Sequence, residues 1–149
     1  MILPAAVASA VVNARTSDLL AYALLAGSAA LGLLVWPALP ETVAIHFGLG
    51  GDPDTFVSKP VGVVLTPAIG VLAVLAVRYA PERLGGHTGS PASENTTILF
   101  VAAVIAYVQA FVYVWNLGYQ LDPKVVSVPV LTAAGLLVVY AYRRDAAAT

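Results

Sequence analysis

Hydrophobic positions along the chain gather into four long runs, separated by shorter polar or proline-containing stretches. An α-helix needs about 20 consecutive apolar residues to cross the bilayer core. Four segments meet this requirement, at residues 18–36, 61–79, 96–118 and 125–142. The pattern predicts an all-α integral membrane protein, a four-helix bundle in which each run is one transmembrane helix.

Residues near the ends of these segments fit the start or the end of a helix. Asp18 suits the positive end of the first helix dipole, and Trp36 suits the membrane interface at its other end. Pro37 follows directly and cannot continue the helix. Pro67 lies inside the second segment, where we expect a kink that neighbouring helices tolerate.

The remaining segments flank or connect the predicted helices. Residues 1–17 form a lead-in, residues 18–142 the transmembrane domain, and residues 143–149 a C-terminal tail. The apolar start of the lead-in is too short to span a bilayer, and no basic residue precedes it, so we do not interpret it as a signal peptide. The linker at 81–95 is rich in Gly, Ser, Pro and Thr, which predicts a flexible connector.

The composition supports insertion into lipid. Hydrophobic residues make up 60% of the 149 residues and charged residues 10%, whereas soluble domains carry about 25% charge. A soluble fold of this length would lack the charged side chains to cover its surface, and lipid removes that requirement. The net charge of −1 offers no basic surface for nucleic acid, and the absence of cysteine excludes disulfides and thiolate metal sites.

Basic residues are distributed unequally around the predicted helices. The first side carries five arginines and the second two lysines: Arg15, Arg78, Arg83, Arg143 and Arg144, against Lys59 and Lys124. Cytoplasmic flanks are enriched in Lys and Arg. We therefore expect both termini in the cytoplasm and the loop between the first two helices outside the cell.

That loop, at residues 37–60, has a pattern of its own. Val43, Ile45 and Phe47 alternate with smaller or more polar residues, which is typical of a short extended segment with one buried face. Gly51 lies in a strong turn signal. We expect an ordered cap over the outer end of the bundle. The residues expected to bind a partner or to hold this cap are Pro40, His46, Phe47, Gly51, Asp54 and Lys59.

His46 and two nearby aspartates admit two interpretations. With Asp52 and Asp54, His46 could ligate a divalent metal, although the spacing matches no metal signature. Alternatively, His46 donates a hydrogen bond within the loop while the aspartates stabilise the turn. We favour the second interpretation and predict no metal and no cofactor. An ion pair between Asp54 and Lys59 would fasten the loop, and the alternative is that Lys59 only extends along the membrane interface.

The third predicted helix has a polar face. Gln109, Tyr113 and Asn116 recur there at helical spacing, together with Ala102 and Ala106. We expect this face to point into the bundle, where Gln109 joins helices or lines a cavity. Asn116 lies near the end of the helix, where we expect solvent to form hydrogen bonds with its amide. The opposite face, expected toward lipid, carries Phe100, Val104, Tyr107, Phe111 and Val114.

An ordered motif across the first loop and into the second helix carries a family resemblance. It comprises Leu39-Pro40, Val43, Ile45-His46-Phe47, Gly51, Pro53-Asp54, Ser58-Lys59 and Pro67. The motif resembles domain of unknown function 1648, best known from SdpI-like proteins, which are small multi-pass membrane proteins that protect bacteria against a secreted killing peptide. Gly48 stands where the family often has Asn, and longer SdpI-like proteins continue into further helices. The resemblance implies a membrane protein without an agreed enzymatic activity and with a role in immunity or signalling.

Several functions are compatible with this pattern. Our leading hypothesis is a binding or protective module whose outward loop recognises an extracellular peptide or a membrane-protein partner. The alternatives are a small transport or channel component, suggested by small residues at Gly62, Thr66 and Gly70, and an accessory subunit of a membrane complex. No ionisable residue lies at the centre of a span, and no catalytic motif is present, so we predict neither a proton-coupled transporter nor an enzyme. The oligomeric state stays open.

Overall fold

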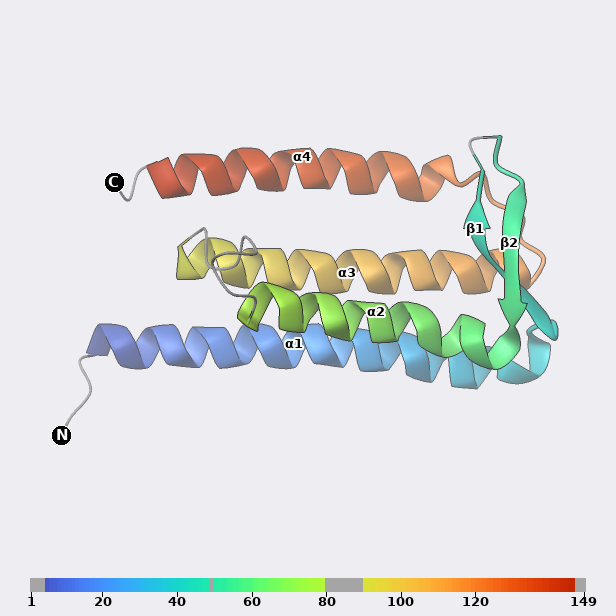
Figure 1. Cartoon of the computed structure of the whole chain (residues 1–149), viewed down its shortest axis with the longest axis horizontal. Helices are drawn as coiled ribbons and strands as arrows, with labels where there is room; N and C mark the ends of the chain where they lie inside the picture. Colours follow the sequence, from blue (N-terminus) through green and yellow to red (C-terminus); the bar gives the residue numbers. More distant parts are fainter. Residues whose placement is uncertain (1–4, 49, 80–89, 147–149) are drawn as a thin grey trace.

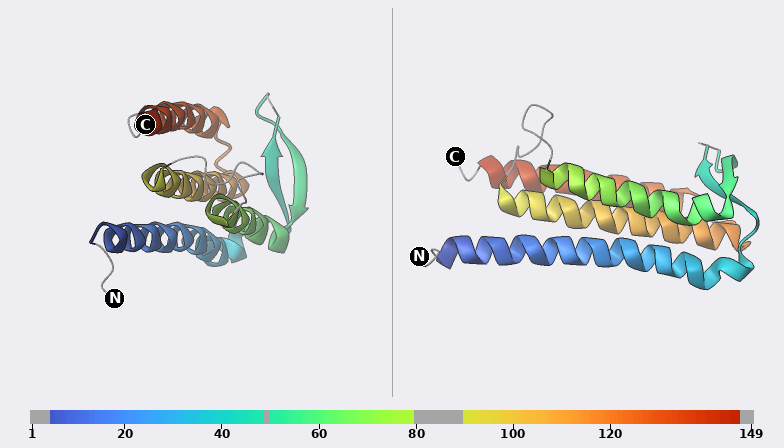
Figure 2. Two further views of the ribbon diagram at one scale, coloured as in Figure 1. Left: turned by 60° about the vertical axis from the view of Figure 1, so that its left-hand side comes forward. Right: turned by 60° about the horizontal axis from the view of Figure 1, so that its bottom comes forward.

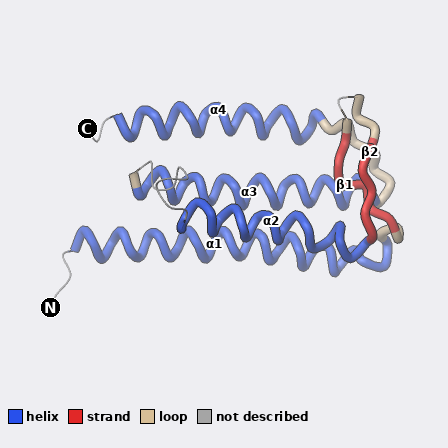
Figure 3. The backbone as a smooth tube through the Cα atoms, viewed as in Figure 1, coloured by secondary structure: helices blue, strands red, loops and turns tan. Residues whose placement is uncertain are grey.

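The computed structural model describes residues 5–48, 50–79 and 90–146. Within these residues, four α-helices lie side by side along one axis, and a β-hairpin lies at one end of them (Figure 1). The elements are α1 (Ala5–Val35), the short 3₁₀ turn η1 (Trp36–Ala38), β1 (Thr42–Phe47), β2 (Pro53–Ser58), α2 (Lys59–Tyr79), α3 (Pro91–Asn116) and α4 (Lys124–Ala146). The predicted helical fold is confirmed, and the strands are confined to the loop between α1 and α2 (Figure 3).

The helices depart from prediction at their ends. α1 begins at Ala5, within the predicted lead-in, so Asp18 lies inside the helix instead of at its N-terminus. α3 begins at Pro91, within the predicted connector, because the Ser90 hydroxyl caps a backbone N–H of the first turn and proline fits the first helical position. The rest of that connector, residues 80–89, lies outside the described residues.

Successive helices run in opposite directions along one long axis. The start of α1 and the end of α4 lie at one end of the molecule, and the hairpin lies at the other (Figures 1 and 2). Segments long and apolar enough to cross a membrane occur in each helix, at Ala14–Ala38, Lys59–Tyr79, Pro91–Asn116 and Lys124–Arg144. Large apolar side chains point outward from them, such as Leu34 of α1 at 79% exposure and Leu136 of α4 at 67%. Such a surface suits lipid and would be unfavourable in water.

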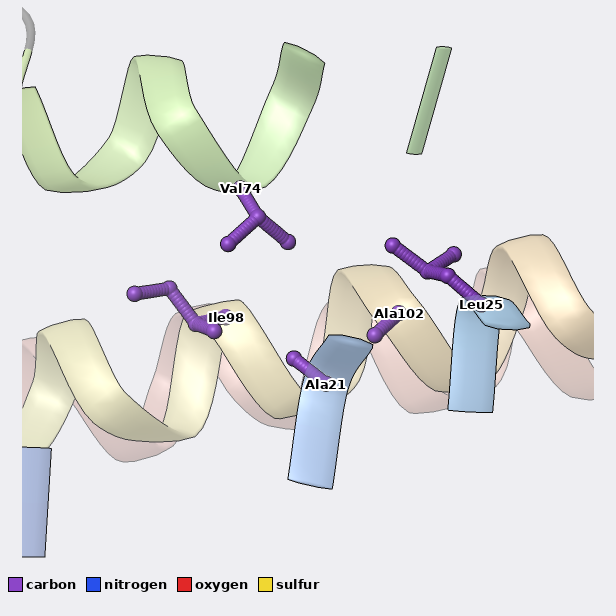
Figure 4. Packing of buried hydrophobic residues seen from close by; sticks show 5 residues of the cluster. All are labelled: Ala21, Leu25, Val74, Ile98 and Ala102. Atoms are coloured by element: carbon purple, nitrogen blue, oxygen red, sulfur yellow. The ribbon is translucent and has the colours of Figure 1, made fainter. Parts of the chain in front are cut away.

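A buried apolar core lies where α1, α2 and α3 meet. Small and branched side chains form a cluster there with at most 2% exposure, comprising Ala21, Leu25, Val74, Ile98 and Ala102 (Figure 4). Gly70 of α2 lies against Leu25, because a Cβ at this position would come within 2.5 Å of the leucine Cδ2. Gly62 lies instead against Val43 of β1. The small-residue face of α2 therefore brings helices and hairpin close together.

α4 is peripheral. Among the described helices it contacts α3 but neither α1 nor α2. It lies on the far side of α3 from α1 in Figure 1 and in the left view of Figure 2. Of its described membrane segment none is buried, against 33% for α3. The bundle is therefore a packed group of α1, α2 and α3 with α4 attached along one side.

The hairpin is antiparallel, with Thr42 opposite Ser58 at its base. Its turn places Gly51 at φ +93°, a backbone conformation that glycine adopts without strain. The predicted extended segment is confirmed as β1, and its alternation of buried and exposed side chains holds except at Ala44. Ala44 is as fully buried as Val43, since β1 lies between β2 and the end of α3, and the pairing shifts after Ala44.

Candidate binding groove at the hairpin end

A side chain at the end of α3 fixes β1. Asn116 Oδ1 accepts a hydrogen bond from the Ala44 N–H, and Asn116 Nδ2 donates one to the Ala44 carbonyl, both at 2.9 Å. The amide thus pairs with β1 much as a neighbouring strand would. The expectation that solvent satisfies Asn116 is wrong, because the hairpin folds onto the end of α3.

Lys59 anchors the foot of the hairpin beside α1. Its side chain is only 8% exposed, and its Nζ lies 3.0 Å from Glu41 Oε1 and 3.4 Å from the Trp36 carbonyl oxygen. The ammonium also lies 5.6 Å from the centre of the Trp36 ring, within range of a cation–π interaction. Of the two interpretations of Lys59, the ion pair with Asp54 is wrong, because the hairpin places Glu41 rather than Asp54 beside the lysine. Pro40 lies exposed between η1 and β1.

Asp54 binds His46 across the hairpin. The distance from His46 Nδ1 to Asp54 Oδ1 is 2.6 Å, and the side chains are 67% and 49% exposed. This hydrogen bond is the main cause that holds the pKa of Asp54 below its ordinary value. The predicted hydrogen bond from His46 within the loop is confirmed. With Nδ1 occupied, the ring keeps Nε2 as its second hydrogen-bonding atom.

The described residues include no group of three His, Asp or Glu side chains placed to hold a metal ion. Asp52 lies in the turn, and Asp54 is engaged by His46 and by the Thr55 hydroxyl at 3.0 Å. His87 lies outside the described residues. The hydrogen bond from His46 Nδ1 to Asp54 orients the imidazole.

Aromatic rings attach the end of β1 to α3. The Phe47 ring centre lies 5.2 Å from those of Phe111 and Trp115, in edge-to-face geometry that favours aromatic attraction. Phe111 is 7% exposed, so the prediction that it faces lipid is wrong, because the hairpin covers it. Tyr107 and Val114, predicted on the same face, are 44% and 36% exposed.

A groove of about 370 Å³ opens between β1, α3 and α4. Its walls are mostly apolar and include Ile45, Phe47, Phe111, Val126, Val130 and Leu131. Of the lining residues that the structure describes, His46 is the ionisable one. Ligand sites are commonly concave and apolar with few polar groups that orient the ligand, and this groove has that form.

The predicted polar residues of α3 lie deeper, between helices. Gln109 is fully buried and its Nε2 donates to the Gly62 carbonyl of α2 at 2.9 Å. The Tyr113 hydroxyl donates to the Ser28 carbonyl of α1 at 3.2 Å, in space left by Gly32. These bonds join α3 to both neighbours, so this face serves helix packing. Gln109 and Tyr113 therefore do not line the groove. The loop residues His46 and Phe47 do line it.

A polar cluster at the opposite end escaped the sequence-based predictions. The Arg78 guanidinium of α2 lies 2.6 Å from Asp18 of α1 and 2.8 Å from Glu94 of α3, and it donates to Asn95 Oδ1 at 3.0 Å. The arginine side chain is 15% exposed. The sequence did contain a signal for this cluster, because Asp18, Arg78 and Glu94 lie at similar depths in neighbouring spans and have opposite charges. Charged side chains inside a membrane are normally paired.

The outward apolar faces of α1, α2, α3 and α4, and the polar bonds between them, define a multi-pass membrane protein. The chain contains a DUF1648 domain: residues 23–71 match the family described as Domain of unknown function (DUF1648). The resemblance of the loop motif to this domain of unknown function is thereby confirmed. The match covers the end of α1, the hairpin and much of α2, whereas the α3 and α4 walls of the groove lie beyond it. Comparison with curated proteins and with solved structures found no match to the chain.

Proposed function

We propose that the protein is a membrane-embedded binding protein, not an enzyme, and that the groove receives an apolar segment of an extracellular peptide. The observation that carries this proposal is the groove itself, an apolar recess with a single imidazole at its edge. Its walls would remove apolar side chains of the peptide from water, and this burial is the main favourable contribution to the free energy of association. His46, oriented by Asp54, supplies a directional hydrogen bond to the peptide.

The specific form of the proposal is protection against a secreted killing peptide. The SdpI-like resemblance of the loop supports it, because the same segment that carries the motif forms β1, one wall of the groove. A peptide held in the groove is withdrawn from the surrounding lipid. Binding alone then suffices for protection, and no chemical step is required.

The proposal requires the hairpin to face outward. In the described residues, Lys59 and Lys124 lie at the hairpin end, and the opposite end carries Arg15, Arg78, Arg143 and Arg144. This asymmetry supports cytoplasmic chain ends. Since the chain has no cysteine, single substitutions Ser58→Cys and Ala146→Cys can be labelled in intact cells with an impermeant thiol reagent. We expect the reagent to label Ser58→Cys and not Ala146→Cys. Labelling of Ala146→Cys alone would show that the orientation is the opposite of the proposed one.

The functional test is survival of a peptide-sensitive bacterial strain that expresses the protein and is exposed to the secreted killing peptide. Val130→Phe fills the groove and should abolish protection. Val138→Phe makes the same change on the exposed side of α4, at 68% exposure, and should leave protection intact. Absence of protection by the unaltered chain would overturn the immunity form.

A further inference from the structure

A second cleft adjoins the groove, between the hairpin turn and the connection from α3 to α4. Its volume is about 440 Å³, and its lining is mainly polar. The lining residues that matter here are Gly51, Asp52, Trp115, Gln120 and Asp122. Pro123 lines both the cleft and the groove, so the two cavities are adjacent.

Two contacts fix the position of the hairpin relative to α3 and the α3–α4 connection, and so fix the positions of the two cavities. Gly51 brings the turn close to the α3–α4 connection, because a Cβ at Gly51 would lie 3.4 Å from Pro123 Cδ. On the other side, the packed rings of Phe47 and Trp115 separate the cavities, with Phe47 toward the groove and Trp115 toward the cleft. The two cavities are therefore neighbours, one apolar and one polar.

The charge at this end of the molecule is negative. The segments at 36–59 and 117–124 contain four carboxylates (Glu41, Asp52, Asp54 and Asp122) against two lysines (Lys59 and Lys124). Lys59 is buried beside Glu41 and does not line the cleft. Lys124 lies 3.4 Å from Asp122, but both side chains are more than half exposed, so water screens this pair. The carboxylates of the cleft thus favour a cation.

We infer that the cleft binds the cationic side chain of an amphipathic peptide whose apolar side chains occupy the groove. Asp52 and Asp122 supply charge-assisted hydrogen bonds to a lysine or arginine, and the Trp115 ring supplies a cation–π surface. This assignment rests on the proposed function and names its ligand class. Charge complementarity selects a cationic peptide over a neutral one of equal apolarity.

The test uses the full chain in nanodiscs of neutral lipid, with Trp36→Phe as background so that Trp115 fluorescence reports binding. The probes are a synthetic amphipathic peptide with lysines and its analogue with glutamine at the same positions. Nanodiscs without protein correct for partition into lipid. We expect the lysine peptide to bind about tenfold more tightly than the analogue, with an advantage that falls as salt increases.

Two variants distinguish the cleft from the groove. Asp52→Asn with Asp122→Asn should remove the lysine advantage, while asparagine keeps the ability to cap the start of α4. Glu41→Gln removes a charge at the same end but outside both cavities, and should retain most of the advantage.

An unchanged lysine advantage in the double variant would overturn the cleft assignment and leave the proposed function intact. Val130→Phe should weaken both peptides equally. If it weakens neither, the proposed function fails.

Discussion

The group of α1, α2 and α3 differs from α4 in how it is held. The first group is joined by buried apolar contacts, by hydrogen bonds from α3 side chains to backbone carbonyls, and by the Arg78 cluster. Within the described residues α4 contacts α3 alone, and the Tyr107 hydroxyl donates to the Val125 carbonyl near its start. Regions with few buried contacts open at the lowest free-energy cost. The wall of the groove that α4 supplies is therefore the one best able to adjust to a ligand.

The largest expected effect comes from crowding the packed group. Gly32→Ala would place a Cβ against the Tyr113 hydroxyl and 2.7 Å from its Cζ, so the tyrosine, which is 1% exposed, would have to shift among its neighbours. We expect a loss of about 2–3 kcal/mol in the free energy of unfolding, measured by circular dichroism during denaturant titration in detergent micelles. Gly27→Ala on the same helix and Gly135→Ala on α4 meet nothing within 4 Å. Equal losses at Gly135 would show that α4 is packed as tightly as α1.

The ionic cluster should rank next. Arg78→Ala leaves Asp18 and Glu94 as neighbouring carboxylates without their shared cation. Because the site is partly exposed, we expect a loss of about 2 kcal/mol, less than for a fully buried pair. Arg144→Ala, on the exposed end of α4, should change stability by less than about 0.5 kcal/mol in the same titration. Similar values for the two variants would remove the distinction between these regions.

Attachment of the hairpin should be affected by Asn116→Ala. The change leaves the Ala44 N–H and carbonyl without their partner, and each unpaired group costs about 1 kcal/mol. Faster hydrogen exchange of the β1 amides would report the loss. Tyr107→Phe removes one bond from a half-exposed side chain and should cost about 0.5 kcal/mol, with faster exchange restricted to the start of α4. Unchanged exchange in β1 would show that the Phe47 rings alone hold the hairpin.

The smallest effect concerns the exposed pair of His46 and Asp54. The pKa of Asp54 is lowered in the folded hairpin, so the unfolded chain binds this proton at higher pH. The pair's contribution is therefore full above the ordinary aspartate pKa and is lost as pH falls through the lowered value. The difference in melting temperature between the unaltered chain and Asp54→Asn should shrink from pH 6 to pH 3. A constant difference would assign the stabilisation to something other than this ionisation.

Residue patterns along the chain located the helices but not their contacts. The hydrogen bond from His46 was predictable because its partner lies eight residues away in the same hairpin. The partner of Lys59 was not, because the choice between Glu41 and Asp54 depends on hairpin register. Phe111 was placed toward lipid because helical spacing gives two faces of a helix without saying what covers each.

The sequence by itself determined the membrane class, the positions of the apolar helices and the ordered loop with its DUF1648 motif. Each of these follows from local properties, since a bilayer core demands a certain length of apolar helix and a turn demands particular residues. Only the tertiary structure decided that β1, α3 and α4 enclose a groove, that an acidic cleft adjoins it, and that Arg78 joins helices at the other end. The physical reason is that these features depend on long-range packing, which places side chains distant in the chain within a few ångströms of each other.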